Sequence, residues 1–151
     1  MVAGWDRYAA QGRGEGNEND DGGWREVTYL DTHIALELAE GDLKRIGRQA
    51  RRTLESDNDL RISPMALLEF EYLRKINRVR LPAEEIAAAL ASDLGVRVCE
   101  VSFAGVGRQA LSEGWTTDPF DRLIVAQARW QKAKLITRDT RMQDNYPLAF
   151  C

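Results

Sequence analysis

The sequence has few of the residues on which disulfide, zinc or histidine-dependent sites are built. Among its 151 residues there are two cysteines and one histidine. Because Cys99 and Cys151 form neither a CxxC motif nor a metal-type spacing, a disulfide scaffold and a structural zinc site are excluded as organising principles, and a reducing cytoplasm is the expected location. No nucleophile motif precedes a helix to pair with the lone His33, which excludes a Ser–His or Cys–His covalent mechanism.

Long hydrophobic runs are also lacking. No apolar stretch approaches the roughly 20 residues that span a bilayer, and no basic segment followed by an apolar one marks a secretion signal, so we expect no membrane association. The length suits one compact domain. The content of 44% hydrophobic and 30% charged residues is typical of a globular protein rather than a disordered one.

The net charge of −3 is unevenly distributed. Residues 1–26 contain six acidic and three basic residues, so residues 27–151 are neutral overall. Half of the twelve glycines lie in residues 4–23, where no apolar periodicity is present. This composition predicts a flexible, acidic, glycine-rich extension at residues 1–26 and a folded domain at residues 27–151. A neutral domain is not drawn to nucleic acid by its overall charge, so such binding would depend on local basic patches.

Short apolar runs alternate with helical patterns through the folded domain. We predict strands at 27–31, 60–63, 96–101, 134–137 and 148–150. We predict helices at 32–39, 42–55, 64–77, 82–94, 103–113 and 119–132. This alternation predicts an α/β fold, a three-layer α/β/α sandwich with a central, mostly parallel sheet. In such sheets, ligands bind beyond the carboxyl ends of the strands.

Acidic residues gather at predicted strand ends and helix starts. Asp31 closes the first predicted strand, and Asp139 follows the strand at 134–137 by two residues. Asp118 and Asp121 bracket the start of the helix at 119–132. Taken singly, each has a structural explanation, since acids at helix N-caps and in first turns stabilise the helix.

Glu69 has no such explanation, because it lies in the middle of its predicted helix. Helical geometry places it at the centre of an apolar face formed by Met65, Ala66, Tyr72, Leu73 and Ile76. A carboxylate on a buried face is costly unless a cation or hydrogen bonds meet it. Asp121 likewise shares a face with Ile124, Val125 and Ala128.

Together, the acids suggest one negative pocket. A carboxylate cluster without cysteine or histidine ligands suits a hard divalent cation, Mg²⁺ or Mn²⁺. Such an ion can activate a water molecule and stabilise the charge that develops on a phosphoryl group. Without metal, the carboxylates would repel one another and some would take up protons.

Four segments that carry these acids resemble the motifs of PIN-domain ribonucleases, specifically the VapC toxins of prokaryotic type II toxin–antitoxin pairs. In chain order they are YLDTH at 29–33, ISPMALLEFEYL at 62–73, TDPFDRLIVAQA at 117–128 and LITRD at 135–139. The resemblance extends over residues 27–147 and implies that residues 27–151 are a PIN domain. It also implies that the catalytic acids are Asp31, Glu69, Asp118, Asp121 and Asp139.

Of these acids, Asp31, Asp121 and Asp139 would hold Mg²⁺ or Mn²⁺, and Glu69 would complete the pocket or position the attacking water. The resemblance further implies a metal-dependent endoribonuclease that inhibits translation by cutting RNA. A cognate antitoxin would hold it inactive, and homodimer formation is expected. The sequence departs from the family pattern at Glu37, where a tryptophan is common, and at residues 115–117, where a histidine is common.

Several further residues have both functional and structural interpretations. The hydroxyls of Thr32 and Thr137 would orient ligands or cap helices, and we favour orientation for Thr32. We expect His33 to be packed behind the site. Two basic groups would hold RNA phosphates, pair with antitoxin acids or form solvated surface. They are Lys44, Arg45, Arg48, Arg51 and Arg52, and then Arg74, Lys75, Arg78 and Arg80.

Three alternatives to a toxin ribonuclease stay open. A phosphatase with Asp31 as nucleophile is disfavoured, because His33 occupies the position where that chemistry usually has a second aspartate. A catalytically silent PIN-like module would bind a partner without cleaving RNA. A PIN nuclease outside any toxin system would keep the acid chemistry and lack an antitoxin.

Overall fold

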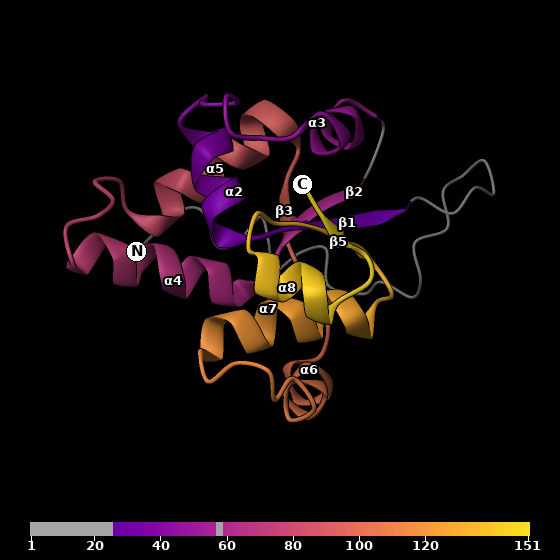
Figure 1. Ribbon diagram of the computed structural model, residues 1–151. Helices are drawn as coiled ribbons and strands as arrows, with labels where there is room; N and C mark the ends of the chain where they lie inside the picture. The colour runs from indigo at the N-terminus through magenta and orange to yellow at the C-terminus, as the bar shows by residue number, and fades with distance from the viewer. Residues whose placement is uncertain (1–25, 57–58) are drawn as a thin grey trace.

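The computed structural model describes residues 26–56 and 59–151, so the predicted extension lies outside the described residues except for Glu26. A single parallel sheet forms its centre, with the strand order β3-β2-β1-β4-β5 (Figure 1). The strands are β1 (Val27–Leu30), β2 (Asp59–Ile62), β3 (Arg97–Val98), β4 (Lys134–Ile136) and β5 (Ala149–Phe150).

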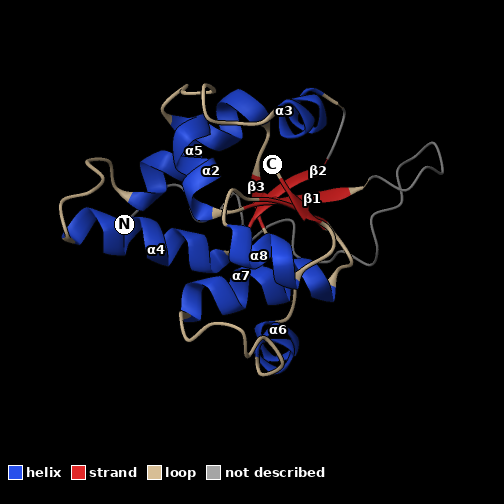
Figure 2. Cartoon of the chain, in the orientation of Figure 1, coloured by secondary structure: helices blue, strands red, loops and turns tan. Residues whose placement is uncertain are grey.

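Helices cover both faces of this sheet (Figure 2). They are α2 (Thr32–Ala39), α3 (Arg48–Glu55), α4 (Pro64–Lys75), α5 (Ala83–Leu94), α6 (Phe103–Ala110), α7 (Pro119–Trp130) and α8 (Thr140–Asn145). Helices α2, α3 and α5 lie on one side of the sheet, and α7 and α8 lie on the other, with α6 packed outside α7. The predicted three-layer α/β/α sandwich is therefore confirmed, and every strand pair in it is parallel.

Consecutive residues of the central strands are buried on opposite faces. Leu30 and Ile136 belong to the core under α2, α3 and α5, whereas Tyr29 and Leu135 belong to the core under α7 and α8. A parallel sheet that is covered on both sides buries side chains on both faces, so its strands are rich in apolar residues. This explains the apolar content of β1 and β4, whereas β2 reads DLRI and keeps Asp59 and Arg61 as an ion pair.

The strand order places the candidate site. The chain builds the sheet outward from β1 through β2 to β3, then returns to the other side of β1 with β4 and β5. The order therefore reverses between β1 and β4, and ligands in open α/β sheets bind at the carboxyl ends of the strands at such a reversal. The residues that follow these two strands are Asp31 and Thr137.

The helix predicted at 42–55 is shorter in the structure and begins at Arg48. Gly47 is its extended N-cap, and a Cβ atom built on Gly47 would lie 2.6 Å from the carbonyl carbon of Cys151. The chain before it forms turns, in which the backbone N–H of Lys44 donates to Asp42 Oδ1 at 3.0 Å. Leu43 belongs to these turns rather than to the helix and is 44% exposed.

The strand predicted at 96–101 is also shorter, with only Arg97–Val98 in β3. One further backbone hydrogen bond joins Cys99 N to Ile62 O, after which the chain leaves the sheet edge toward α6. Helix α8 was not expected from the sequence. The remaining predicted elements occur with boundaries that differ by at most three residues. Among the described helices, none is long and apolar enough to cross a membrane.

Candidate functional site

Asp31 lies directly after β1, where its carboxylate is fixed from two sides. Its Oδ1 accepts a hydrogen bond from the backbone N–H of Thr32 at 2.8 Å, so Asp31 is the N-cap of α2. Its Oδ2 accepts a hydrogen bond from the hydroxyl of Thr137 at 2.8 Å. The side chain that the sequence places at the end of β1 is therefore tied to the end of the neighbouring strand β4.

Thr137 also holds Asp139. The fully buried Thr137 hydroxyl accepts a hydrogen bond from the backbone N–H of Asp139 at 3.0 Å while it donates to Asp31. Asp139 in turn is the N-cap of α8, and its Oδ1 accepts from Arg141 N at 2.7 Å and Met142 N at 3.3 Å. Asp139 thus caps a helix, as the structural explanation predicted, and still lies beside Asp31.

Glu69 faces the start of α2. The buried Thr32 hydroxyl donates a hydrogen bond to Glu69 Oε2, which joins α4 to the residue next to Asp31. This contact supplies the hydrogen bond that a mid-helix carboxylate requires when it is partly buried. The hydroxyl of Thr32 therefore orients an acid of the site, as that of Thr137 does.

The prediction that Glu69 is at the centre of the buried face of its helix is wrong. Glu69 is half-buried, and the buried residues of α4 are Ala66, Phe70 and Leu73. Tyr72 is 52% exposed, because α4 extends past the sheet and only part of its circumference is covered (Figure 1). The Tyr72 ring packs instead against Phe120, with ring centroids 6.0 Å apart.

Asp118 and Asp121 begin α7. Asp118 Oδ1 accepts hydrogen bonds from Phe120 N at 2.8 Å and Asp121 N at 3.3 Å, so the capping role is confirmed for Asp118. Asp121 lies in the first turn and is half-buried. The face that it shares with Ile124, Val125 and Ala128 is the buried face, as predicted.

The electrostatics show that the acids lie close together. Burial raises the pKa of Asp121 to about 7, and the negative charges of Asp118, Asp31, Asp139 and Glu69 add to this rise. Burial also raises the pKa of Asp31, with a contribution from Asp139, although hydrogen bonds from Thr137 and Thr32 oppose it. Carboxylates from four separate segments therefore act on one another at a single edge of the sheet.

Glu69 belongs to the same group. Burial raises its pKa, the hydrogen bond from Thr32 opposes the rise, and the charges of Asp31 and Asp118 reinforce it. A raised pKa at several neighbouring acids indicates a site that favours added positive charge, either protons or a cation.

We expected His33 to be packed behind the site, but its side chain is exposed. The buried residues of α2 are Thr32, Ile34, Ala35 and Leu38, which leaves His33 on the outer side. Its positive charge when protonated lowers the pKa of both Asp31 and Glu69, so its ring lies near these carboxylates. Its position two residues after Asp31 was the signal that could have placed it at the site edge.

Glu37 and Arg138 form an ion pair that the sequence did not suggest. Arg138 Nη2 lies 2.5 Å from Glu37 Oε1, and both side chains are mostly buried. Arg138 stands between Thr137 and Asp139, so the pair ties α2 to the loop that carries Asp139. The remaining Glu37 Oε2 and Arg138 Nη1 atoms are buried and have no hydrogen-bond partner among the described residues.

The donor atoms at this edge are carboxylate and hydroxyl oxygens. In residues 26–56 and 59–151, no three His, Cys, Asp or Glu side chains form a ready-made cluster for a metal ion. Mg²⁺ does not require one, because it commonly keeps several waters and binds through one or two carboxylates. The oxygen donors and their raised pKa values therefore fit a hydrated hard cation.

Comparison with solved structures finds the same fold in toxin–antitoxin assemblies. A chain in a toxin–antitoxin complex from Klebsiella pneumoniae is 20% identical with a TM-score of 0.57, and the match covers 82% of this chain and 96% of that one. A chain in VapBC2 from Rickettsia felis bound to a promoter DNA fragment is 18% identical with a TM-score of 0.57, with 82% and 97% covered. A chain in DNA-bound VapBC from Salmonella typhimurium is 18% identical with a TM-score of 0.53, and the match covers 83% of this chain and 99% of that one.

At these identities the solved structures establish similarity of fold. No curated protein matches the sequence. The PIN domain family model, however, matches residues 28–147, a range that contains every acid described above. The protein therefore belongs to the PIN domain family.

Proposed function

We propose that the protein is a metal-dependent endoribonuclease and the toxin of a type II toxin–antitoxin pair. The observation that carries this proposal is the meeting of five acids, from four segments, at the carboxyl edge of β1 and β4. Membership of the PIN domain family supports nuclease activity. Phosphodiester hydrolysis needs positive charge at the reacting phosphate, and an anionic pocket is the means of holding a divalent cation there.

In the proposed site, Asp31, Asp121 and Asp139 hold Mg²⁺ or Mn²⁺ directly or through water. When bound, such an ion supplies an acidified water and stabilises charge on the phosphoryl group. The protein contributes orientation: Thr137 fixes the Asp31 carboxylate, and Asp118 holds the start of α7 so that Asp121 faces the same edge. Asp118 also adds negative charge next to Asp121.

Glu69 is the residue that we assign to the attacking water. Its Oε2 is engaged by Thr32, which leaves Oε1 as the oxygen that can accept a proton or hydrogen bond from water. The burial that raises its pKa makes it a better proton acceptor than an ordinary carboxylate. Thr32 has the role of setting the direction of this carboxylate.

The toxin role extends the proposal to a protein partner. The solved structures with the same fold come from toxin–antitoxin complexes, which supports a cognate antitoxin. In this proposal the antitoxin blocks the carboxyl edge of β1 and β4 where the five acids meet, which we call the acid edge. Homodimer formation is part of the same proposal. The alternatives are a PIN nuclease without an antitoxin and a silent binding module, and the complete set of acids disfavours the second.

The test is an RNA cleavage assay with the purified protein. We expect fragments in the presence of Mg²⁺ or Mn²⁺ and intact RNA in excess EDTA, and sequencing the fragment ends would identify the target. Intact RNA in both conditions, over a panel of tRNA, ribosomal and messenger RNA, would favour the silent binding module. Cleavage by a protein whose gene has no small antitoxin gene beside it would favour the nuclease without a partner.

A further inference from the structure

The acid edge cannot by itself hold RNA. The inference that follows rests on the proposed function, because it concerns the RNA that the protein would cleave. Five acids act on one another there, and in the absence of a bound cation their negative charge repels the phosphates of a polyanion. Affinity of proteins for nucleic acid comes chiefly from Lys and Arg side chains that neutralise phosphates. The cations that bind the flanking phosphates must therefore lie outside the acid edge.

Many arginines in the described part of the chain are already occupied. Those paired with acids are Arg61, Arg74, Arg97, Arg129 and Arg138. An arginine held by a carboxylate has lost much of its attraction for a phosphate, because its charge is neutralised and its donors are used. The groups that remain available to bind a phosphate are therefore a few exposed basic side chains.

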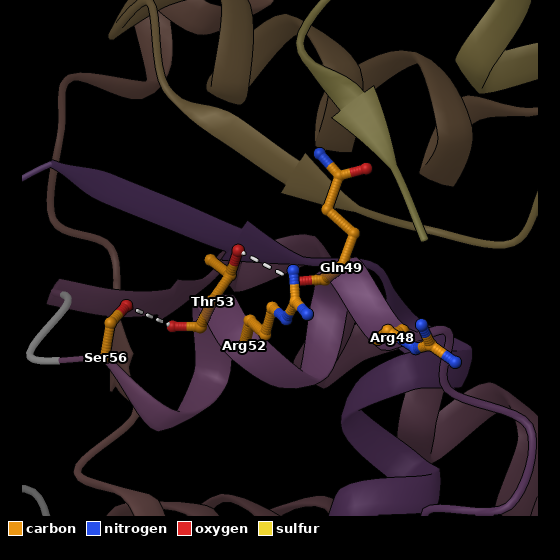
Figure 3. A pocket seen from close by; sticks show the side chains of 5 residues that line it. All are labelled: Arg48, Gln49, Arg52, Thr53 and Ser56. Carbon is orange, nitrogen blue, oxygen red and sulfur yellow. Dashed lines mark hydrogen bonds between the residues drawn. The ribbon is translucent and has the colours of Figure 1, made fainter.

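Helix α3 carries two exposed arginines that are not occupied in this way (Figure 3). Arg48 and Arg52 are one helical turn apart and border a surface hollow of about 480 Å³. Neither guanidinium forms a hydrogen bond or ion pair with any residue in 26–56 or 59–151. Arg51, on the same helix, is instead turned back onto the carbonyls of Ile46 and Leu43.

The other residues of the hollow are polar and uncharged. They are Gln49, Thr53 and Ser56, and the view shows all five side chains arising from α3 and its C-terminal end (Figure 3). The Thr53 hydroxyl donates to Gln49 O at 3.2 Å, and the Ser56 hydroxyl donates to Thr53 O at 2.8 Å. None of the described residues that line the hollow is acidic, so none of them competes with an anionic ligand for the two guanidinium groups.

The start of α3 is at the same edge of the sheet as the acids. Gly47 N lies 3.5 Å from Cys151 Sγ, and Cys151 directly follows β5. Thr137 directly follows β4, and its backbone N–H donates to Phe150 O at the end of β5 at 2.9 Å. The end of β5 is therefore level with the end of β4. Arg48 therefore begins a helix that starts beside the carboxyl ends of β4 and β5 and runs away from the acids.

The geometry points to the hollow on α3 as a binding site for the RNA sugar–phosphate backbone. Arg48 and Arg52 would contact two phosphates of a strand whose scissile bond lies at the acid edge. Guanidinium groups bind phosphate oxygens through paired hydrogen bonds, and arginines one turn apart form a continuous cationic line along one side of a helix. Contacts of this kind position the strand without selecting its sequence.

The test uses the whole chain in EDTA, so that binding is measured without cleavage. A fluorescently labelled oligouridine is titrated with wild type, with the double variant R48Q/R52Q and with the control R78Q/R80Q. The control removes the same two positive charges from the segment that follows the C-terminal end of α4. That end lies one helix length away from Ser63, which is the N-cap of α4 at the carboxyl edge of the sheet. Each phosphate contact on a single strand contributes about 0.7 to the slope of log affinity against log salt.

We expect R48Q/R52Q to bind about 25-fold more weakly at ~0.1 M salt and to lower the slope by about 1.4, with R78Q/R80Q equal to wild type. Equal binding by R48Q/R52Q and wild type, or an equal loss in the control, would overturn the site. Wild type that binds polyglutamate as tightly as oligouridine would also overturn it, since the hollow would then suit an acidic protein.

The result of this binding test can be distinguished from the result of the RNA cleavage assay that tests the proposed function. If wild type cleaves RNA, R48Q/R52Q should raise KM with little change in kcat, because the two arginines bind the strand away from the reacting bond. If wild type binds oligouridine through these arginines and yet cleaves no RNA with Mg²⁺, the nuclease proposal fails while the binding site stands.

Discussion

The Thr137 hydroxyl donates a hydrogen bond to Asp31 Oδ2 at 2.8 Å, across 106 positions of the sequence. The same hydroxyl accepts from Asp139 N, so one buried threonine connects the acids that follow β1 and β4. Its partners lie at the point where the strand order reverses. The site is thus built into the parallel pairing of β1 with β4 rather than into a loop.

We predict that Thr137→Val is destabilising and Thr137→Ser is much less so. Valine has a similar shape but no hydroxyl, so it leaves buried polar atoms of Asp31 and Asp139 unpaired, at a cost of about 1–3 kcal/mol in the free energy of unfolding. Serine keeps both hydrogen bonds. Urea denaturation of the three proteins measures this difference, and equal stability of the valine and serine variants would show that the hydroxyl does not hold the two acids.

Asp31→Asn and Asp121→Asn should each abolish RNA cleavage while the domain stays folded. Asparagine at 31 can still cap α2 through its amide oxygen, while its NH2 group would donate to the Thr137 hydroxyl where the second Asp31 oxygen accepts, and asparagine at 121 removes a charge that its neighbours disfavour. Circular dichroism establishes folding, and initial rates measure cleavage. Asp93→Asn, on the exposed side of α5, is the matched control and should cleave as wild type does. Wild-type rates in both site variants would remove these acids from the mechanism.

The metal-free protein should lose stability as the pH rises. Burial and then the neighbouring acids raise the pKa of Asp121 from 3.8 to about 7 in the folded state, so the folded protein binds this proton more tightly than the unfolded chain does. The free energy of unfolding therefore falls between about pH 4 and pH 7 as the proton is released. Asp121→Asn should flatten the profile, and saturating Mg²⁺ should oppose the fall. A profile that rises across this window in EDTA would contradict the crowding of the acids.

Glu37 and Arg138 should show a measurable coupling energy. In a double-mutant cycle with Glu37→Gln and Arg138→Gln, we expect a coupling of about 1–3 kcal/mol, since each single variant leaves a mostly buried group unpaired. The exposed pair Glu71 and Arg74 is the matched control and should couple much more weakly, because water and salt screen both charges. Equal coupling in the two cycles would show that Glu37 does not anchor the loop that carries Asp139.

The positions of the acids relative to the sheet were predictable from the sequence. Asp31 and Asp139 follow apolar runs, and all parallel strands end at the same edge, so the fold class alone brings them near each other. Asp118 before Pro119 is a common start of a helix, and it begins α7 here. The resemblance to PIN domains then connected Glu69 and Asp121 to the same edge.

What could not be predicted depends on contacts between distant segments. The start of α3 is set by the approach of Cys151 to Gly47, 104 positions away, which no local pattern records. The exposure of Tyr72 depends on how far α4 extends past the sheet, and that of His33 on which side of α2 is covered. The direction of the Thr137 hydroxyl depends on the register between β1 and β4, and that of the Thr32 hydroxyl depends on the position of Glu69 on α4.

The central claim is that these acids form a divalent-cation site, and a Mn²⁺ titration followed by the electron paramagnetic resonance of the free ion tests it directly. We predict saturable binding to wild type and to Asp93→Asn, with affinity that increases as the pH rises toward about 8 because protons compete for Asp121. Asp31→Asn and Asp121→Asn should each weaken binding by at least about tenfold. Binding that is the same in all four proteins, or absent from wild type, would contradict the claim.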